Sequence, residues 1–145
     1  MNISTKGRYA LRMLIDLAEH QNAGYISLKE IAARQNISKK YLEQIVPLFH
    51  NSGMLKANRG PKGGYMLAML PEKYTVGDIL QLTEGSLSLA PDADPDPTDC
   101  GQDTDLAMLP IWQGLSRVIK EYLDGITLQD ILDQLQDHYM NNYMI

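Results

Sequence analysis

A group of polar side chains after Ser38 has the donors and acceptors needed to read the edges of DNA bases. Lys39, Lys40, Glu43 and Gln44 fall within two helical turns of this serine. Gln can pair bidentately with adenine, Glu can accept from the cytosine amino group, and Lys can donate to guanine or to phosphate. Residues at the N-terminal end of a recognition helix are the ones that enter the major groove. The solvated face of an ordinary helix has the same composition, so this group alone leaves both interpretations open.

A second basic group, Arg59 and Lys62, lies in a segment rich in glycine and proline between Asn58 and Gly64. Strands expected at residues 54–57 and 65–68 would make this segment the tip of a hairpin. A thin basic tip beside a recognition helix can enter the adjacent minor groove, whose narrow form attracts Arg. A simple hairpin turn is the alternative, but the position after two helices favours a wing. The expected DNA contacts of the tip are Arg59, Gly60, Pro61 and Lys62.

Two short helices should position these residues. Ser27 followed by Glu30 forms a capping box that begins a helix, and the pattern stops near Asn36. Ser38 can cap a second helix, which Pro47 should bend or shorten. The apolar face of this second helix is formed by Leu42, Ile45, Val46 and Phe49. Ser27, Ser38 and Tyr41, at the two helix starts, complete the expected contacts of the helix-turn-helix.

A preceding helix should support this unit, with Thr5 as its cap and an apolar stripe that packs on the two short helices. Lys6 and Arg8 lie near its start, where side chains and free N–H groups can hold a phosphate without reading sequence. Ordinary surface charge is the alternative. A short helix capped by Thr75 and ending at Gly85 closes a winged helix-turn-helix domain over residues 1–84, which makes the fold mainly α with a small β wing.

The charge of the chain is segregated. The formal net charge is −5, but residues 1–70 hold ten Lys and Arg against four Asp and Glu, a net +6, and residues 71–145 hold a net −11. A basic half that faces DNA and an acidic half repelled by phosphates would orient the protein. The sequence has no secretory segment and no apolar run long enough to span a bilayer, so we expect a cytoplasmic protein.

The remaining residues divide into a loop and an arm. Residues 85–105 are rich in Asp and Pro without a regular period, and we expect a solvated acidic loop there, without the spacing of a calcium-binding loop. Residues 106–123 have the longest helical pattern, with Pro110 in its first turn and a length of roughly 27 Å at about 1.5 Å per residue. We expect this helix to pair with its copy across a two-fold axis, and packing inside its own chain is the alternative. The residues expected at the dimer interface are Ile111, Trp112, Leu115, Val118, Ile119 and Tyr122.

Four motifs occur in order along the chain: MNISTKGRYALRMLIDLA, SLKEIAARQNISKKYLEQ, RGPKGGYML and ITLQDIL. With them the sequence resembles the Rrf-two family of bacterial winged helix-turn-helix transcription regulators, roughly over residues 1–84 and 106–135. The resemblance implies a homodimer that binds a palindromic operator, which we expect to act as a repressor.

Members of this family that sense iron–sulfur status, nitric oxide or redox state place three cysteines in the loop, whereas this loop has only Cys100. A cluster takes about four ligands, so we expect no iron–sulfur cluster and no metal. A regulator of the same family that senses redox state or a cluster remains the alternative, with Cys100 as a lone redox switch; its acidic neighbours should blunt its reactivity.

A short last helix, capped by Thr127 with Asp130, should fold back on the chain. The final residues, 138–145, are apolar for a free terminus and end in Tyr143, Met144 and Ile145. Within the family this tail is similar to the CymR branch, the cluster-free repressors of cysteine metabolism, and the resemblance implies a partner, cysteine synthase (O-acetylserine thiol-lyase). An extended tail would offer an apolar anchor and a carboxylate that helix N-termini can hold. Docking on the dimer and fraying are the alternatives.

An enzyme is not expected, because the sequence has no nucleophile with a paired base, no metal-ligand spacing and no phosphate-binding loop. His20, His50 and His138 are scattered along the chain. A winged fold that binds only proteins is a third possibility, and the basic character of residues 1–70 argues against it.

Overall fold

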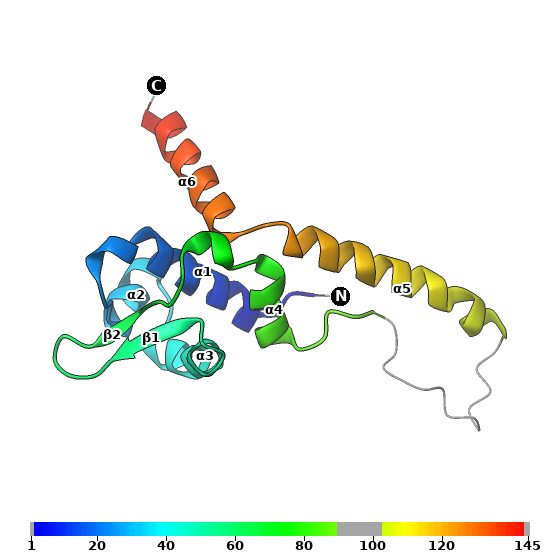
Figure 1. The fold of residues 1–145 in the computed structure, drawn as a ribbon, viewed down its shortest axis with the longest axis horizontal. Coiled ribbons are helices and arrows are strands. Elements are labelled where there is room, and N and C mark those ends of the chain that lie inside the picture. Colours follow the sequence, from blue (N-terminus) through cyan, green and yellow to red (C-terminus); the bar gives the residue numbers. More distant parts are fainter. Residues whose placement is uncertain (1, 90–102, 144–145) are drawn as a thin grey trace.

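The computed structural model describes residues 2–89 and 103–143, except the side chain of Tyr143. In Figure 1, α1 to α4 and the hairpin form one body, and α5 and α6 project from it in different directions. The elements are α1 (Thr5–Glu19), η1 (Gln21–Ala23), α2 (Leu28–Gln35), α3 (Lys39–Asn51), β1 (Leu55–Asn58), β2 (Gly64–Leu67), η2 (Pro71–Lys73), α4 (Val76–Glu84), α5 (Asp103–Asp124) and α6 (Leu128–Tyr143).

The cap of α1 is Ser4, and the expected cap Thr5 is the first helical residue instead. The Ser4 hydroxyl oxygen accepts a hydrogen bond from the Gly7 N–H at 3.0 Å. Ser4 is held in this place by Glu84 at the end of α4, whose carboxylate accepts from the Ser4 N–H at 3.0 Å and from its hydroxyl at 2.6 Å. A contact with a residue far along the chain therefore decides where the helix begins.

The helix-turn-helix forms as predicted. The Ser27 hydroxyl accepts from the Glu30 N–H at 3.2 Å, and the Glu30 carboxylate accepts from the Ser27 N–H at 3.3 Å, which is the reciprocal pair of a capping box. Asn36 ends α2 in the left-handed conformation, with φ of 53°. Ser38 then caps α3. Pro47 does not shorten this helix, which continues to Asn51.

The wing is an antiparallel hairpin in which Leu55 pairs with Leu67 and Asn58 with Gly64. Its strands are displaced by one residue from the expected ranges. Met54 is not a strand residue, because its N–H closes the end of α3 on the Phe49 carbonyl at 2.9 Å. Beside the hairpin, Ile26 forms a single antiparallel bridge with Tyr65.

One apolar core joins α1, α3, α4 and the first turn of α6. Tyr74 lies inside this region with no exposed surface, and its hydroxyl donates to the Met54 carbonyl at 2.6 Å and accepts from the Met69 N–H at 3.1 Å. It thereby ties the base of the wing to the segment before α4. The fully buried core residues include Ala10, Met13, Leu14, Ile31, Leu42, Ile45, Phe49, Ile79 and Leu128.

The two helices after residue 102 differ from the expectation, α5 at its start and α6 at its end. α5 begins at Asp103, so residues 103–105 are helical rather than loop, and Pro110 lies inside the helix rather than in its first turn. Asp103 and Asp105 favour this earlier start, because carboxylates in a first turn complement the helix dipole. At the other end α6 continues through residues 138–143, which we expected as an extended tail. Met144 and Ile145 lie outside the described residues.

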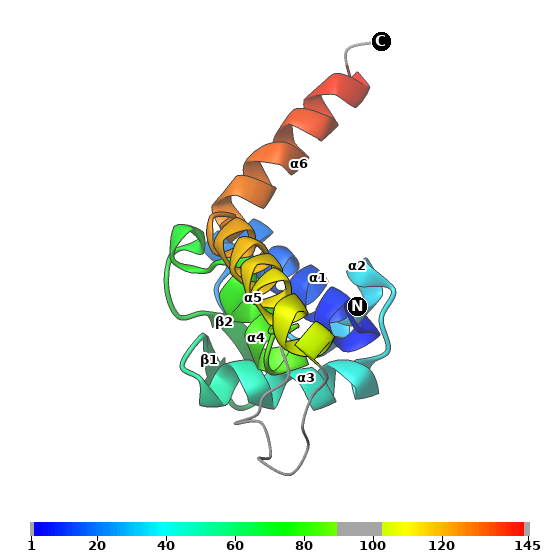
Figure 2. The same cartoon turned by 90° about the vertical axis from the view of Figure 1, so that its right-hand side faces the viewer.

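The corner between α5 and α6 is hydrogen-bonded to the winged body. The Val76 N–H donates to the Ile126 carbonyl at 2.8 Å, and the Leu128 N–H donates to the Tyr74 carbonyl at 2.9 Å. The first half of α6 packs on α1 and η2. Beyond this contact residues 136–142 are exposed, so the outer half of the helix leaves the body (Figures 1 and 2).

Tyr74→Phe should lower the free energy of unfolding by about 1 to 3 kcal/mol, because two partly buried backbone groups lose their partner. Burial raises the pKa of the Tyr74 phenol above its usual value of 10.0. The unfolded chain therefore loses this proton first, and the stability that Tyr74 provides is full below pH 10.0 and declines as the pH rises toward the folded pKa. Urea unfolding at neutral and alkaline pH would measure both effects. Tyr25→Phe, at an exposed tyrosine, is the control, and equal behaviour of the two variants would contradict the assignment.

Candidate nucleic-acid interface

The outer face of α3 is available to a large ligand. Its apolar side is buried, whereas Lys40 and Gln44 are exposed. Lys39 and Glu43 lie 3.9 Å apart, with side chains 59% and 55% exposed. An ion pair this exposed contributes little, so both side chains are free to turn toward a base or phosphate. Ser38 is also exposed, while its hydroxyl accepts from the Tyr41 N–H at 3.1 Å.

Tyr41 joins the start of α3 to α1. Its ring meets that of Tyr9 edge to face, with centroids 5.3 Å apart and planes at 77°. Lys6 is three residues before Tyr9 and therefore lies on the same face of α1. Arg8 is exposed, and its guanidinium donates to the Ile3 carbonyl at 3.2 Å. The two expected phosphate contacts therefore flank the residue that touches α3.

The wing lies beside α3 on the same side of the body (Figure 1). Arg59, Gly60, Pro61 and Lys62 are all exposed at its tip. The tip is closed by a hydrogen bond from the Gly63 N–H to the Gly60 carbonyl at 2.8 Å. Gly60 has a φ of 115°, which side-chain-bearing residues rarely adopt, so a glycine is required there. The expected major-groove and minor-groove residues are thus brought to one surface, whereas Ser27 is half-buried and its hydroxyl serves the cap of α2.

A buried carboxylate that sequence reasoning missed fixes this surface to α1. Asp16 is 1% exposed and accepts a bidentate pair from Arg34, with Nε at 3.0 Å and Nη2 at 2.7 Å. The Gln35 amide donates to the same carboxylate at 3.0 Å. The His20 ring lies 3.7 Å from it. The hydrogen bond to Asp16 raises the pKa of Arg34 above its usual value. Arg34 and Gln35 are the last two residues of α2, directly before the turn into α3.

Arg12 adds further contacts between α1 and the end of α2. Its guanidinium donates to the Gln35 backbone carbonyl, at the C-terminal end of α2, and lies over the Tyr9 ring at 5.4 Å from the centroid. Tyr9, Arg12 and Asp16 are thus three points on α1 that hold the end of α2 and the start of α3. The Arg12 guanidinium is therefore engaged within the helix-turn-helix itself. In the sequence, the only sign of these contacts is Asp16, a charged residue inside the apolar stripe of α1.

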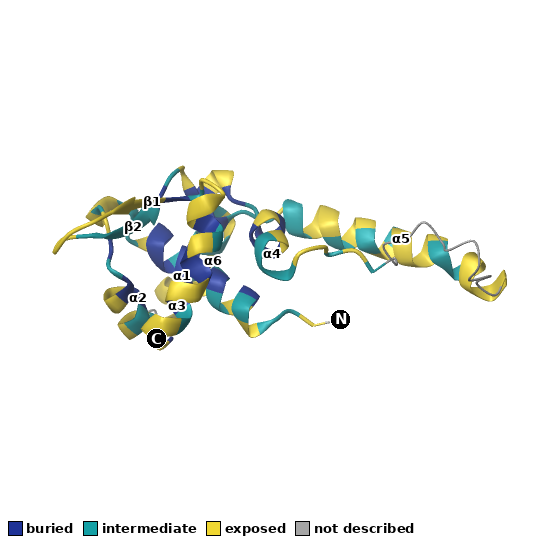
Figure 3. Cartoon of the chain, turned by 90° about the horizontal axis from the view of Figure 1, so that it is seen from below, coloured by how far each residue is buried: buried dark blue, intermediate teal, exposed yellow. Residues whose placement is uncertain are grey.

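The α5 residues expected at the dimer interface do not all face the same way. Ile111, Leu115, Val118 and Tyr122 are 54%, 43%, 57% and 69% exposed, and their spacing of four, three and four residues is that of a heptad seam. Ile119 is half-buried and lines a cleft against α4, so it faces its own chain. Trp112 is 40% exposed. α5 has no buried residue over roughly 33 Å of helix, and exposed and half-buried residues alternate along it in Figure 3.

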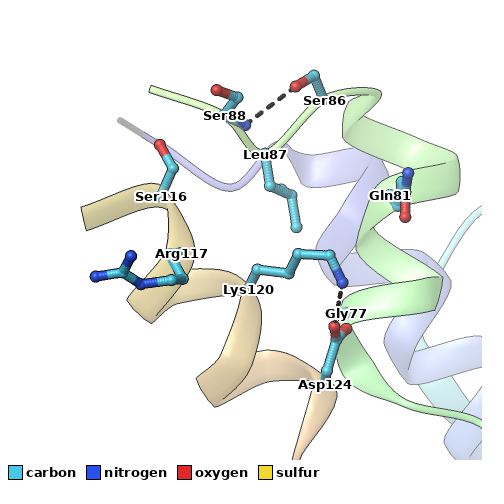
Figure 4. A pocket seen from close by; sticks show the side chains of 9 residues that line it. All are labelled: Gly77, Gln81, Ser86, Leu87, Ser88, Ser116, Arg117, Lys120 and Asp124. Carbon is cyan, nitrogen blue, oxygen red and sulfur yellow. Dashed lines mark hydrogen bonds and ion pairs between the residues drawn. The ribbon is translucent and has the colours of Figure 1, made fainter. Parts of the chain in front are cut away.

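A cleft of about 460 Å³ separates α5 from α4 and residues 86–88 (Figure 4). The side chain of Leu87 points into it, and Lys120 forms an ion pair with Asp124 across from Gly77. Nearby, the Leu89 N–H donates to the Ser116 hydroxyl at 2.7 Å. The Leu89–Ser116 hydrogen bond attaches the inner side of α5 to its own chain, whereas Ile111, Leu115 and Val118 stay exposed.

The residues present do not fit an iron–sulfur cluster. The sequence contains a single cysteine, Cys100, which lies outside the described residues. Among the described residues, no group of three His, Cys, Asp or Glu side chains could hold a metal ion. In the same part of the chain, no helix is long and apolar enough to cross a membrane.

Comparison with known proteins decides the family. Residues 3–134 match Rrf2, described as an iron-dependent transcriptional regulator. The chain belongs to the Rrf2 family. The HTH-type transcriptional regulator CymR of Bacillus subtilis is 40% identical over 143 residues, which cover 97% of this chain and 98% of that protein.

Solved structures agree with this Rrf2 assignment. The structure described as CymR, the global cysteine regulator of B. subtilis, has a TM-score of 0.77 at 37% identity, covering 92% of this chain and 98% of that one. IscR of T. potens has a TM-score of 0.75 at 37% identity, covering 95% and 90%. The predicted winged-helix fold and the predicted class, a DNA-binding transcription regulator rather than an enzyme, are confirmed. The individual DNA-contact and dimer residues remain predictions.

Arg34→Ala should destabilise the fold by about 3 kcal/mol, because it leaves the buried Asp16 carboxylate without its cation. Lys29→Ala, at an exposed lysine of the same helix, should change stability by less than about 0.5 kcal/mol. Chemical denaturation of both variants would measure the difference. Equal stability of the two variants would contradict the structural role of the pair.

Arg59→Ala should weaken DNA binding by about 1 to 3 kcal/mol, and Gln44→Ala should relax preference at one base position. Lys6→Ala should weaken binding to all sequences alike and reduce the salt slope by about 1 per bound subunit. Fluorescence anisotropy with a genomic duplex selected by the protein, and with a random duplex, would distinguish these roles. If all three variants lost the same affinity on both duplexes, the base-reading assignment would be wrong.

Proposed function

We propose that the chain is a homodimeric, cytoplasmic repressor that binds a palindromic operator of cysteine- and sulfur-metabolism genes. The observation that carries the proposal is the pairing of an exposed polar face on α3 with a basic wing on one surface, in a chain 40% identical to CymR over nearly its full length. Each subunit would place residues 38–44 in a major groove and Arg59 in the flanking minor groove. Half-sites would lie one helical turn or a multiple apart.

The seam of α5 supports the homodimer. Four large apolar side chains in heptad spacing are exposed on a helix that the rest of its chain covers on one side only. Exposed apolar surface of this extent is uncommon on a monomer, and a second α5 would cover it. A two-fold axis across the helices would present two reading surfaces to a palindrome.

Val118→Glu should dissociate the dimer, because it puts a charge into an apolar interface. Gln113→Glu adds the same charge at an exposed position off the seam and should leave the dimer intact. Sedimentation velocity would give the oligomeric state, and circular dichroism would confirm that both variants are folded. A folded Val118→Glu variant that remained dimeric at micromolar concentration would exclude this seam as the interface.

Cysteine synthase is the proposed protein partner. The relative CymR is described as a global cysteine regulator, and the present chain ends in an apolar sequence with Tyr143, Met144 and Ile145. Residues 136–142 of α6 are exposed and extend away from the winged body, where another protein could approach this helix (Figure 2). Docking would place the terminal carboxylate at a helix N-terminus of the enzyme.

Removal of residues 143–145 should abolish binding to cysteine synthase while DNA binding is retained. Gln136→Ala, at an exposed residue of the same helix, is the control. Isothermal titration of full-length protein, truncated protein and control against the enzyme would test this. Binding of the truncated protein with unchanged affinity would remove the partner from the proposal and leave the DNA-binding function standing.

We also propose that no iron–sulfur cluster is bound, since one cysteine per chain cannot supply the usual set of thiolates. Protein purified without oxygen should then lack visible charge-transfer absorbance. A coloured protein with about one cluster per subunit would instead favour a cluster-sensing regulator, in line with the description of the family.

A further inference from the structure

A second cleft lies between α3 and the wing, outside the set of residues expected to bind DNA except for Arg59. Its volume is about 480 Å³. Its polar lining consists of His50 and Asn51 from the last turn of α3, and Asn58 and Arg59 from the end of β1. All four residues are exposed. No acidic side chain lines the cleft.

The rest of the lining is apolar. Val46 and Pro47 contribute from α3, and Ala57 and Tyr65 from the two strands of the wing. Val46 is buried and Tyr65 is half-buried, so this part is a firm floor rather than a set of mobile side chains. The ring of Pro47 presents only carbon atoms to the cleft. The cleft therefore combines an apolar floor with a rim of hydrogen-bond donors and one cation.

This combination matches a sugar–phosphate strand. Deoxyribose rings are largely apolar, and each phosphate accepts hydrogen bonds from Arg, Asn and His side chains. A major groove and the adjacent minor groove of a duplex are separated by one strand. A protein with α3 in the first groove and the wing tip in the second must accommodate that strand between the two elements, which is where the cleft lies.

We infer that the cleft between α3 and the wing seats the strand separating the two grooves, with His50, Asn51 and Asn58 as phosphate contacts. This inference rests on the proposed DNA binding and adds a third point of attachment between the two reading elements. Because these contacts touch only the backbone, they fix how deeply α3 and the wing enter their grooves without selecting a base.

The direct test is a gain of affinity, which misfolding cannot imitate. Asn51→Lys places a cation in the cleft of each subunit. It should tighten binding about 5- to 10-fold per bound subunit near 0.1 M salt, with the slope of log K against log salt steeper by about 0.9 per subunit, or about 1.8 for the homodimer. Gln134→Lys adds the same charge at an exposed position of α6 and should change neither quantity by a comparable amount. Both variants would be measured on a random 30-base-pair duplex and on a genomic fragment selected by the protein.

A loss-of-affinity variant and a DNA modification complete the test. His50→Glu should weaken binding to both duplexes by a similar factor, as expected for a backbone contact. Ethylation of the phosphates between the major-groove and minor-groove contacts should block binding of the wild-type protein.

If Asn51→Lys binds no tighter than Gln134→Lys while Arg59→Ala weakens binding, the cleft inference is wrong and the proposed function stands. If the wild-type protein binds neither duplex, the proposed function itself fails.

Discussion

The bidentate pair between Asp16 and Arg34 is the interaction on which the reading surface depends. A carboxylate that is 1% exposed is costly to bury unless its charge and lone pairs are matched, and Arg34 and Gln35 supply three hydrogen bonds to it. Both donors are at the end of α2, so the pair specifies where the turn into α3 begins. The Tyr9–Tyr41 contact then fixes the first turn of α3 itself. The residues predicted to contact bases are thus exposed side chains on a firmly held helix, as precise base recognition would require.

The two halves of the chain have separate physical roles. The winged body carries a net positive charge, with Lys39, Lys40, Arg59 and Lys62 exposed on α3 and the wing, whereas the later residues carry the acidic surplus. Tyr74 and the hydrogen bonds around residues 126–128 connect the two, so the base of the wing, the start of α4 and the α5–α6 corner share one buried junction. A pair of chains joined through α5 would transmit its geometry to the reading surfaces through this junction.

The sequence predicted the features that depend on neighbouring residues. Ser27 with Glu30, Ser38, and Thr75 before Gly85 determine their helix ends through contacts within three or four positions, and apolar spacing identified the buried face of α3. Prediction from the sequence failed where a residue distant along the chain determines the local structure. Glu84 selects Ser4 over Thr5 as the cap of α1, and Asp16 finds its partner 18 positions away. Helical spacing identified the apolar stripe of α5, but the place of Ile119 against α4 needed the tertiary structure.

Hydrogen–deuterium exchange of the protein, alone and with a selected operator duplex, tests the central claim most directly. The account predicts slower amide exchange in residues 38–44 and 58–63 when DNA is bound, with the outward face of α5 unchanged. Protection confined to α5 and α6, with no change in α3 or the wing, would contradict it.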